Sequence, residues 1–438
     1  MAVPRNKSTG RGITRRGFLG GTAAAFAMPL IIPRIARGQT AANNRLGLGF
    51  IGLGGRGMGH VKSFMHAADV QVVAVCDPYR SKQQAAVQAV ERHYAGRANR
   101  GDYKGCGAYS DFRELLARDD VDAVVIASPE FWHALQSVRA MEAGKDVFCE
   151  KALSLTVAEG RAVCDAVRRC GRVYQLGTQQ RSSRNFRFAC ELARNGYLGK
   201  VWTVKVGCPG GRALPDVPPE PPPPGLDYEM WLGPAPESPY NKLKCTYNWY
   251  FIYDYCTGWI QSWGVHHVDI ALWGAPSLAS SRLEVVGKAT FPEQGIANTS
   301  IAWRVEIASG DGVRLSFSDN SRHQQGCRFE GDQGWVHVNR SGIRAEPKSL
   351  LQVAIKPGEE HLYESYNHQQ NFLECVRTRR EPAAPVEGGH AATTITNIAD
   401  IACRTGRTLA WDWKKHEFVN DGGANRFLSR PMRSPWTL

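Results

Sequence analysis

Three glycines and an aspartate give the first chemical signal in this sequence. Gly52, Gly54 and Gly57 form a Gly-x-Gly-x-x-Gly pattern after a short apolar run, and Asp77 ends the next apolar run. Glycines at this spacing let the backbone turn tightly and approach a pyrophosphate, which the free N–H groups of a following helix can bind. A carboxylate at the end of the second strand can accept hydrogen bonds from a ribose diol. The pattern therefore predicts a dinucleotide site.

The residues after the second strand bear on which dinucleotide binds. The Asp77 carboxylate would repel a 2′-phosphate, which favours NAD over NADP. Arg80 and Lys82 follow closely and would attract such a phosphate. NADP therefore stays open as the less favoured alternative.

Segments typical of strands and helices alternate through the first third of the chain. They are 45–51, 58–67, 71–76, 112–117, 121–127, 132–143 and 146–149. Such repeats predict an α/β fold with a doubly wound parallel sheet, in which ligands bind at the carboxyl ends of the strands. Ser128, His133, Glu150 and Lys151 follow strand ends. We therefore expect them near the dinucleotide, together with Gln179 after a later strand.

Three ordered motifs resemble the Gfo/Idh/MocA oxidoreductases, which include glucose–fructose oxidoreductase and inositol dehydrogenase. The motifs are Gly-Phe-Ile-Gly-Leu-Gly-Gly-Arg-Gly at 49–57, Met-Glu-Ala-Gly-Lys-Asp-Val-Phe-Cys-Glu-Lys at 141–151 and Trp-Gly-Val-His-His-Val-Asp at 263–269. The resemblance implies an N-terminal Rossmann domain followed by an α/β domain with a large, mostly antiparallel sheet. It also implies an NAD(P) cofactor, a sugar or cyclitol substrate and a homo-oligomer.

The resemblance assigns the two catalytic roles. Lys151 is implied to hydrogen-bond the reacting hydroxyl and assist its deprotonation, and His266 to act as a general acid or base. The family has a proline after the lysine and an acid four residues before the histidine, where this chain has Ala152 and Ser262. Asp269 lies three residues after His266 on the same helical face and is expected to orient it.

An aromatic run, 248–256, precedes the histidine segment. Rings over the C–H faces of a sugar, with a carboxylate for its hydroxyls, would make a carbohydrate subsite. We therefore expect Tyr253, Asp254, Tyr255 and Asp269 to contact substrate, with ordinary packing as the alternative for the aromatic residues. Asp254 or Asp269 is expected to replace the acid missing at Ser262.

The second half of the chain is expected to contain an extended segment, several strands and two helices. Six prolines between 215 and 224 predict an extended excursion. Alternating runs between 282 and 338 predict strands, and 369–379 and 391–404 predict helices. The expected divisions are a signal at 1–38, a Rossmann domain at 39–165, a substrate-binding and oligomerisation domain at 166–410 and a tail at 411–438.

The N-terminus resembles a twin-arginine export signal of bacteria. Thr14-Arg15-Arg16-Gly17-Phe18-Leu19 follows a basic stretch and precedes an apolar run too short to anchor in a membrane. We therefore expect export by the twin-arginine machinery and a periplasmic or exported location. That route carries folded proteins, which favours a tightly bound cofactor.

Composition narrows the remaining function classes. The net charge is +13 over 438 residues, but seven of the positive charges fall within residues 1–38, leaving +6 for the rest. No clustered basic module predicts nucleic-acid binding. The twelve cysteines show neither a Cys-x-x-Cys pair nor zinc-ligand spacing, so no metal is predicted. An oxidising compartment would permit disulfides.

Two activities fit these signals. The first is hydride transfer from a secondary hydroxyl carbon of a sugar, sugar derivative or cyclitol. The alternative is an NAD-dependent glycoside hydrolase, which oxidises C3, eliminates the aglycone, adds water and returns the hydride. The export signal and Ser262 favour the alternative, because a periplasm offers little free NAD for recycling.

Overall fold

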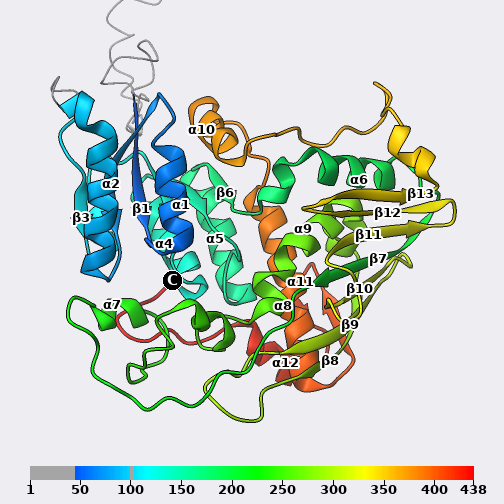
Figure 1. Cartoon of the computed structure of the whole chain (residues 1–438). Helices are drawn as coiled ribbons and strands as arrows, with labels where there is room; N and C mark the ends of the chain where they lie inside the picture. The colour runs from blue at the N-terminus through cyan, green and yellow to red at the C-terminus, as the bar shows by residue number, and fades with distance from the viewer. Residues whose placement is uncertain (1–44, 99–102) are drawn as a thin grey trace, which may run out of the picture. The chain divides into compact units, whose positions relative to one another are not determined.

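The computed structural model describes residues 45–98 and 103–438, and the first of its sheets is entirely parallel (Figure 1). The strands run in the order β3-β2-β1-β4-β5-β6. They are β1 (Leu46–Ile51), β2 (Val70–Cys76), β3 (Gly107–Tyr109), β4 (Ala123–Ile126), β5 (Asp146–Cys149) and β6 (Tyr174–Leu176). The order reverses between β1 and β4, as in a Rossmann fold, so the predicted parallel α/β sheet is confirmed.

Helices cover both faces of this sheet. They are α1 (Gly55–Phe64), α2 (Arg80–Ala98), α3 (Phe112–Leu116), α4 (His133–Glu142) and α5 (Val157–Cys170). Phe50 packs in one core cluster with Phe64 of α1, and Val124 packs in another with Leu135 of α4. Every residue of β1, β4 and β5 is buried. Strands buried on both faces form continuous apolar runs, which explains their clear signal in the sequence.

The second sheet is larger and mostly antiparallel. Its order is β13-β12-β11-β7-β10-β9-β8-β14-β15, and among these described strands only β7 and β10 pair in parallel. The strands are β7 (Val201–Cys208), β8 (Leu283–Thr290), β9 (Ala302–Ser309), β10 (Arg314–Asp319), β11 (Gly326–Gly331), β12 (Gly334–Asn339), β13 (Gly342–Glu346), β14 (Leu409–Asp412) and β15 (Glu417–Phe418). This confirms the predicted second α/β domain.

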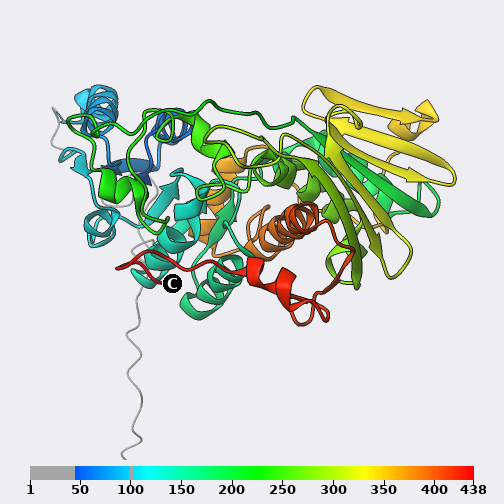
Figure 2. The ribbon, with the colours of Figure 1, turned by 90° about the horizontal axis from the view of Figure 1, so that it is seen from below.

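Helices α9 and α11 lie against one face of the second sheet (Figures 1 and 2). The helices of this half are α6 (Arg184–Arg194), α7 (Tyr228–Leu232), α8 (Trp259–Ser262), α9 (Gly264–Gly274), α10 (His368–Thr378), α11 (Val386–Thr405) and α12 (Gly422–Asn425). Every residue of α9 is buried, because the sheet and α11 enclose it. Residues of β8 and β9 alternate between buried and exposed, so the other face of the sheet meets solvent at these two strands.

A long segment returns from the second half to the Rossmann sheet. Residues 209–223 form neither helix nor strand, which agrees with the expected proline-rich excursion (Figure 1). The chain then reaches the residues that follow β2: Arg80 N donates to Gly225 O at 2.9 Å, and Tyr79 pairs with Leu226. This segment therefore packs directly beside Asp77.

The C-terminal tail also crosses to the Rossmann half (Figure 2). Trp436 meets Trp132 edge to face, with ring centres 4.9 Å apart, and stacks on Phe112 at 6.0 Å. No helix within residues 45–98 and 103–438 has the length and apolarity to span a membrane. The predicted export signal at 1–38 lies outside the described residues.

Candidate active site

Asp77 fixes the glycine loop between β1 and α1. Its Oδ2 accepts a hydrogen bond from Leu53 N at 2.7 Å, and its Oδ1 accepts one from Tyr79 N at 2.9 Å. Burial raises the pKa of Asp77, while the charge of Lys82, 3.9 Å away, and the two backbone bonds oppose that rise. Each carboxylate oxygen keeps a second lone pair that a ribose hydroxyl can use.

The three glycines of the loop have different surroundings. A Cβ on Gly57 would lie 1.9 Å from Gly52 O, and a Cβ on Gly52 would lie 2.4 Å from Ser128 N. A Cβ on Gly54 would meet no atom within 4 Å. Two glycines therefore close the turn, and the third leaves open space at the N-terminus of α1. These residues fit the pyrophosphate of a dinucleotide.

Glu150, the residue before Lys151, binds two side chains of α1, the helix that follows the glycine loop. Its Oε1 accepts from Arg56 Nε at 2.6 Å and pairs with His60 Nε2 at 2.8 Å. Burial alone would raise the pKa of Glu150, but the His60 bond and the Arg56 charge outweigh it and hold that pKa well below the usual range. Glu150 is thus a buried, ionised anchor for α1.

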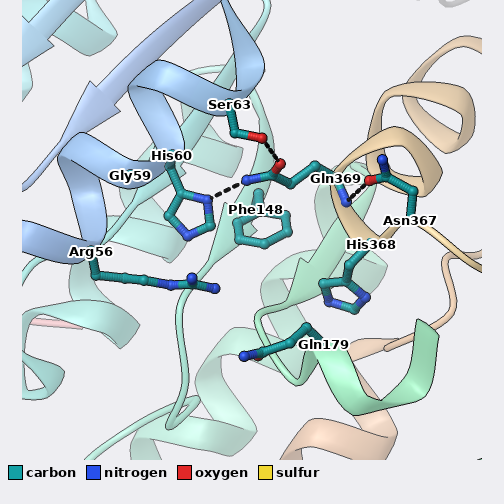
Figure 3. A pocket seen from close by; sticks show the side chains of 9 residues that line it. All are labelled: Arg56, Gly59, His60, Ser63, Phe148, Gln179, Asn367, His368 and Gln369. Atoms are coloured by element: carbon teal, nitrogen blue, oxygen red, sulfur yellow. Dashed lines mark hydrogen bonds between the residues drawn. The ribbon is translucent and has the colours of Figure 1, made fainter. Parts of the chain in front are cut away.

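A pocket of about 320 Å³ opens between α1 and α10 (Figure 3). Its lining residues are Arg56, Gly59, His60, Ser63, Phe148, Gln179, Asn367, His368 and Gln369. Gln369 closes one side by bonding His60 Nδ1 at 2.8 Å and accepting a bond from Ser63. Gln179 Oε1 is buried without a partner among the described residues, so it is available to a ligand.

Lys151 lies between three residues from different elements. Its Nζ donates to Ser262 Oγ at 2.6 Å and lies 3.6 Å from Glu130 Oε1. The centre of the Tyr250 ring is 5.2 Å away. The peptide bond between Lys151 and Ala152 is cis. Glu130 therefore provides the carboxylate beside the lysine, and neither Asp254 nor Asp269 takes that place as expected.

His266, on α9, is buried at 5% exposure. Its Nδ1 has no hydrogen-bond partner among the described residues. Burial, followed by the charges of Lys151 and Arg340, lowers the pKa of His266 well below its usual value. The ring is therefore neutral near pH 7 and able to accept a proton.

Asp269 does not orient His266. Arg181 binds both of its oxygens, with Nε 2.8 Å from Oδ2 and Nη2 2.7 Å from Oδ1. Asp269 is only 1% exposed. The prediction that it orients His266 was wrong, because an arginine 88 residues earlier in the chain binds its carboxylate, and its contact with substrate stays a prediction.

Both ring nitrogens of His133 contact backbone carbonyls, and its place at the cofactor stays a prediction. Its Nδ1 lies 2.6 Å from Ala152 O and its Nε2 lies 2.9 Å from Ser128 O. Burial lowers the pKa of His133, but contacts with Cys149 and Ala152 O and the Glu130 charge raise it to about 9. Both nitrogens are therefore committed to carbonyls, and His133 ties the segment after β4 to the one after β5. Ser128 itself donates to Gln136 at 2.7 Å.

The tyrosines expected to contact substrate lie in packed surroundings. Tyr255 is buried against Phe131 and Trp231, with ring centres 5.2 and 5.0 Å away. Tyr253 is held between the guanidinium groups of Arg404 and Arg430. Both tyrosines therefore serve packing, which was the alternative. Asp254 is half-buried, and the structure gives it no role at Lys151.

The ring that reaches the lysine is Tyr250, of the 3-10 helix η4 (Tyr247–Phe251). Trp249 stacks on Tyr250 at 3.7 Å, and Tyr247 lies 4.9 Å from Tyr250. Tyr247 is 59% exposed. The three rings form an aromatic platform beside Lys151, suited to the C–H face of a sugar.

Two charged residues in the site were missed from the sequence. Glu130 directly follows Ser128-Pro129 at the end of β4, so its place at a strand end was the signal that could have found it. Arg340, in the turn between β12 and β13, reaches Trp263 with 4.8 Å between its guanidinium and the ring centre. No spacing in the sequence brings Arg340 to this site.

Residues 45–98 and 103–438 contain no group of three or more potential metal ligands. All twelve cysteines are free thiols. The fold and site thus define a dinucleotide-binding enzyme, and Lys151 and the neutral His266 are its candidate catalytic residues.

Two family profiles match the chain. "Oxidoreductase family, NAD-binding Rossmann fold" matches residues 46–178, and "Oxidoreductase family, C-terminal alpha/beta domain" matches residues 202–438. The protein belongs to the Gfo/Idh/MocA oxidoreductase family, as the resemblance indicated.

Solved structures share the fold. The aldose-aldose oxidoreductase from Caulobacter crescentus has a TM-score of 0.61 and 20% identity over 83% of this chain and 99% of the other. The WlbA dehydrogenase from Bordetella pertussis, solved with NADH and UDP-GlcNAcA, has a TM-score of 0.61 and 17% identity over 83% and 98%.

Curated relatives carry glycosidase names. A "Glycosyl hydrolase family 109 protein" of Shewanella pealeana is 31% identical over 179 residues, 41% of this chain and 37% of the relative. An "Alpha-N-acetylgalactosaminidase" of Shewanella oneidensis is 33% identical over 154 residues, 35% and 33% of the two chains. The chain thus matches only about a third of the length of these relatives.

Proposed function

We propose that this protein is an NAD(P)-dependent oxidoreductase that removes a hydride from a secondary hydroxyl carbon of a sugar, sugar derivative or cyclitol. The observation that carries the proposal is the position of Lys151. Its Nζ is bonded to Ser262 at 2.6 Å, burial and the lysine charge lower the pKa of the neutral His266, and Lys151 directly follows the Glu150 that anchors α1.

Each residue has a defined task in this reaction. NAD, bound through the glycine loop and Asp77, supplies the hydride acceptor. Lys151 Nζ takes the hydroxyl proton as the C–H bond breaks, so that the carbon becomes a carbonyl. The aromatic platform of Tyr247, Trp249 and Tyr250 holds the sugar face, and His266 receives the same proton from Lys151 and passes it on.

A glycoside hydrolase is the second candidate, favoured by the neutral His266 and the glycosidase relatives. Oxidation at C3 acidifies the proton on C2. His266 removes that proton while the bond from C1 to the aglycone breaks. Water then adds at C1, a proton returns to C2, and the hydride returns to C3. The cycle leaves no net change in the cofactor.

Stoichiometry separates the two candidates. The purified protein, with no NAD added, is incubated with a panel of p-nitrophenyl glycosides and free sugars. Release of many equivalents of nitrophenol without net absorbance at 340 nm identifies the glycosidase. One equivalent of NADH, with further turnover only on added oxidised cofactor, identifies the dehydrogenase. Absence of both, from protein shown to hold cofactor, would refute the proposal.

We further infer that NAD, rather than NADP, is bound tightly and loaded before twin-arginine export to the periplasm. The support is the Asp77 carboxylate and the segment around Leu226, which packs beside it and hinders release. Mass spectrometry of nucleotide released from the purified protein, grown without supplementation, tests the inference. Recovery of nucleotide-free protein would overturn it.

A homo-oligomer, expected from the family, is tested by light scattering.

A further inference from the structure

Among the described residues, Glu130 is the carboxylate that pairs with the Nζ of Lys151. It begins the 3-10 helix η2 (Glu130–Trp132) after β4 and is 1% exposed. Its Oε1 lies 3.6 Å from Lys151 Nζ and accepts a bond from Ala152 N at 3.3 Å. Its Oε2 accepts from Cys256 Sγ at 3.1 Å. Both oxygens are therefore fixed in place.

Lys151 is the basic side chain that balances the charge of this carboxylate whenever its Nζ carries the proton. A buried carboxylate is costly unless it is paired and hydrogen-bonded. Within residues 45–98 and 103–438, the ion-pair partner of Glu130 is Lys151. The second contact of the lysine, Ser262, is a neutral hydroxyl that accepts one bond. The negative charge beside Nζ thus comes from the Rossmann half and not from α8.

We propose that Glu130 is the positioning carboxylate of Lys151, which holds Nζ against Ser262 and stabilises the ammonium that forms when the lysine takes the substrate proton. The inference rests on the function proposed for Lys151. As the O–H bond of the substrate breaks, a new N–H bond makes the lysine cationic 3.6 Å from a carboxyl group that Ala152 N and Cys256 Sγ hold in place. When the hydride returns, the same ammonium gives its proton back to the carbonyl oxygen.

The first test needs no substrate. Cofactor-loaded protein is treated with acetic anhydride at one pH, and the rate of acetylation at Lys151 is followed by peptide mass spectrometry. A carboxylate favours the unreactive ammonium, so Glu130→Gln should accelerate acetylation by about tenfold or more. The amide of Gln can still accept from Ala152 N. A rate within about twofold of wild type, well below the effect of a charge at this distance, overturns the proposal.

Glu159→Gln is the matched control, because Glu159 is also a buried carboxylate but caps α5. It should leave the acetylation rate of Lys151 unchanged. If Glu130→Gln does not fold, the comparison is made with Glu130→Asp, which keeps the charge and should retain slow acetylation. Fast acetylation in that variant, with normal melting, would also refute the assignment.

The second test uses a substrate on which wild type turns over. Glu130→Gln should lower kcat by about 10²-fold, since misplacing a reacting group by about 1 Å costs that much, and should leave KM nearly unchanged. Adding Ser262→Asp to Glu130→Gln should restore at least a tenth of the wild-type kcat, about tenfold above the single variant. If Glu130 only supported the fold, an acid at position 262 would not restore kcat.

Lys151→Met separates this proposal from the proposed function. If Lys151→Met keeps wild-type turnover, the function assigned to the lysine is wrong. If Lys151→Met is inactive while Glu130→Gln has normal kcat and normal acetylation, only the role of Glu130 is wrong.

Discussion

Replacing Gly54 should abolish cofactor binding without harming the fold. Gly54 precedes α1 with φ −64° and ψ −176°, a backbone that any residue can adopt. A Cβ there would meet no protein atom within 4 Å. Gly54→Ala should therefore keep the stability of the nucleotide-free protein or raise it by about 0.4–1 kcal/mol. Gly54→Val places a larger group in the space that the pyrophosphate needs.

The loss of binding has a measurable size. A ligand at about 100 times its Kd stabilises the folded state by about 2.7 kcal/mol. Wild-type protein stripped of nucleotide should gain that amount when NAD is added, whereas Gly54→Val should gain nothing. Urea unfolding with and without NAD measures the difference. Nucleotide released from protein purified without stripping provides a second measurement.

Gly57→Ala is the contrasting variant. Its Cβ would lie 1.9 Å from Gly52 O, a backbone atom that cannot move aside. This variant should be destabilised by about 1–3 kcal/mol or more, even without nucleotide. The reasoning fails if Gly54→Val binds NAD as wild type does, because the open space would then not be the pyrophosphate site.

Three further predictions concern the site and its support. Lys151→Met and His266→Ala should each lower turnover by at least about 10²-fold with bound cofactor and melting nearly unchanged, as kinetics and calorimetry would show. Arg181→Met should cost about 3–5 kcal/mol in urea unfolding because it leaves the buried Asp269 unpaired, and adding Asp269→Leu should recover much of that loss. Burial lowers the pKa of His390 to about 3. Below pH 6.5 the unfolded chain therefore binds more protons than the folded protein, and the free energy of unfolding decreases as the pH decreases. His390→Gln should reduce that fall between about pH 7.5 and pH 5.5 by about 1.4 kcal/mol, and an unchanged slope would contradict the assignment.

The sequence indicated the Rossmann half well because its signals are local. Gly52, Gly54 and Gly57 follow a strand buried on both faces, and Asp77 ends the next strand. A glycine turn, a helix N-terminus and a strand end are set by neighbouring residues. The positions of Glu150 and Lys151 at the end of β5 follow from the same rule.

The errors arose where distant residues meet. Helical spacing correctly placed His266 and Asp269 on one helix, but it gave no sign that Arg181 would occupy the carboxylate. The aromatic run has no strand-like alternation, so the sequence did not show which of its rings are buried. In the structure η4 places Tyr250 at Lys151, and Tyr255 packs in the core. Composition indicated a carbohydrate subsite without telling which rings form it.

The position of Lys151 depends on both halves of the protein. Lys151 ends a Rossmann strand, yet Ser262 of α8 binds its Nζ. Gln261, which precedes Ser262 in α8, donates a hydrogen bond to Ser154 O at 3.2 Å. This bond holds the segment that follows the lysine. On the other side, Leu153 N donates to Thr393 of α11 at 3.4 Å. The helices that cover the second sheet therefore hold the chain on which the lysine stands, and a Rossmann domain alone would bind a dinucleotide but would not fix its proton acceptor.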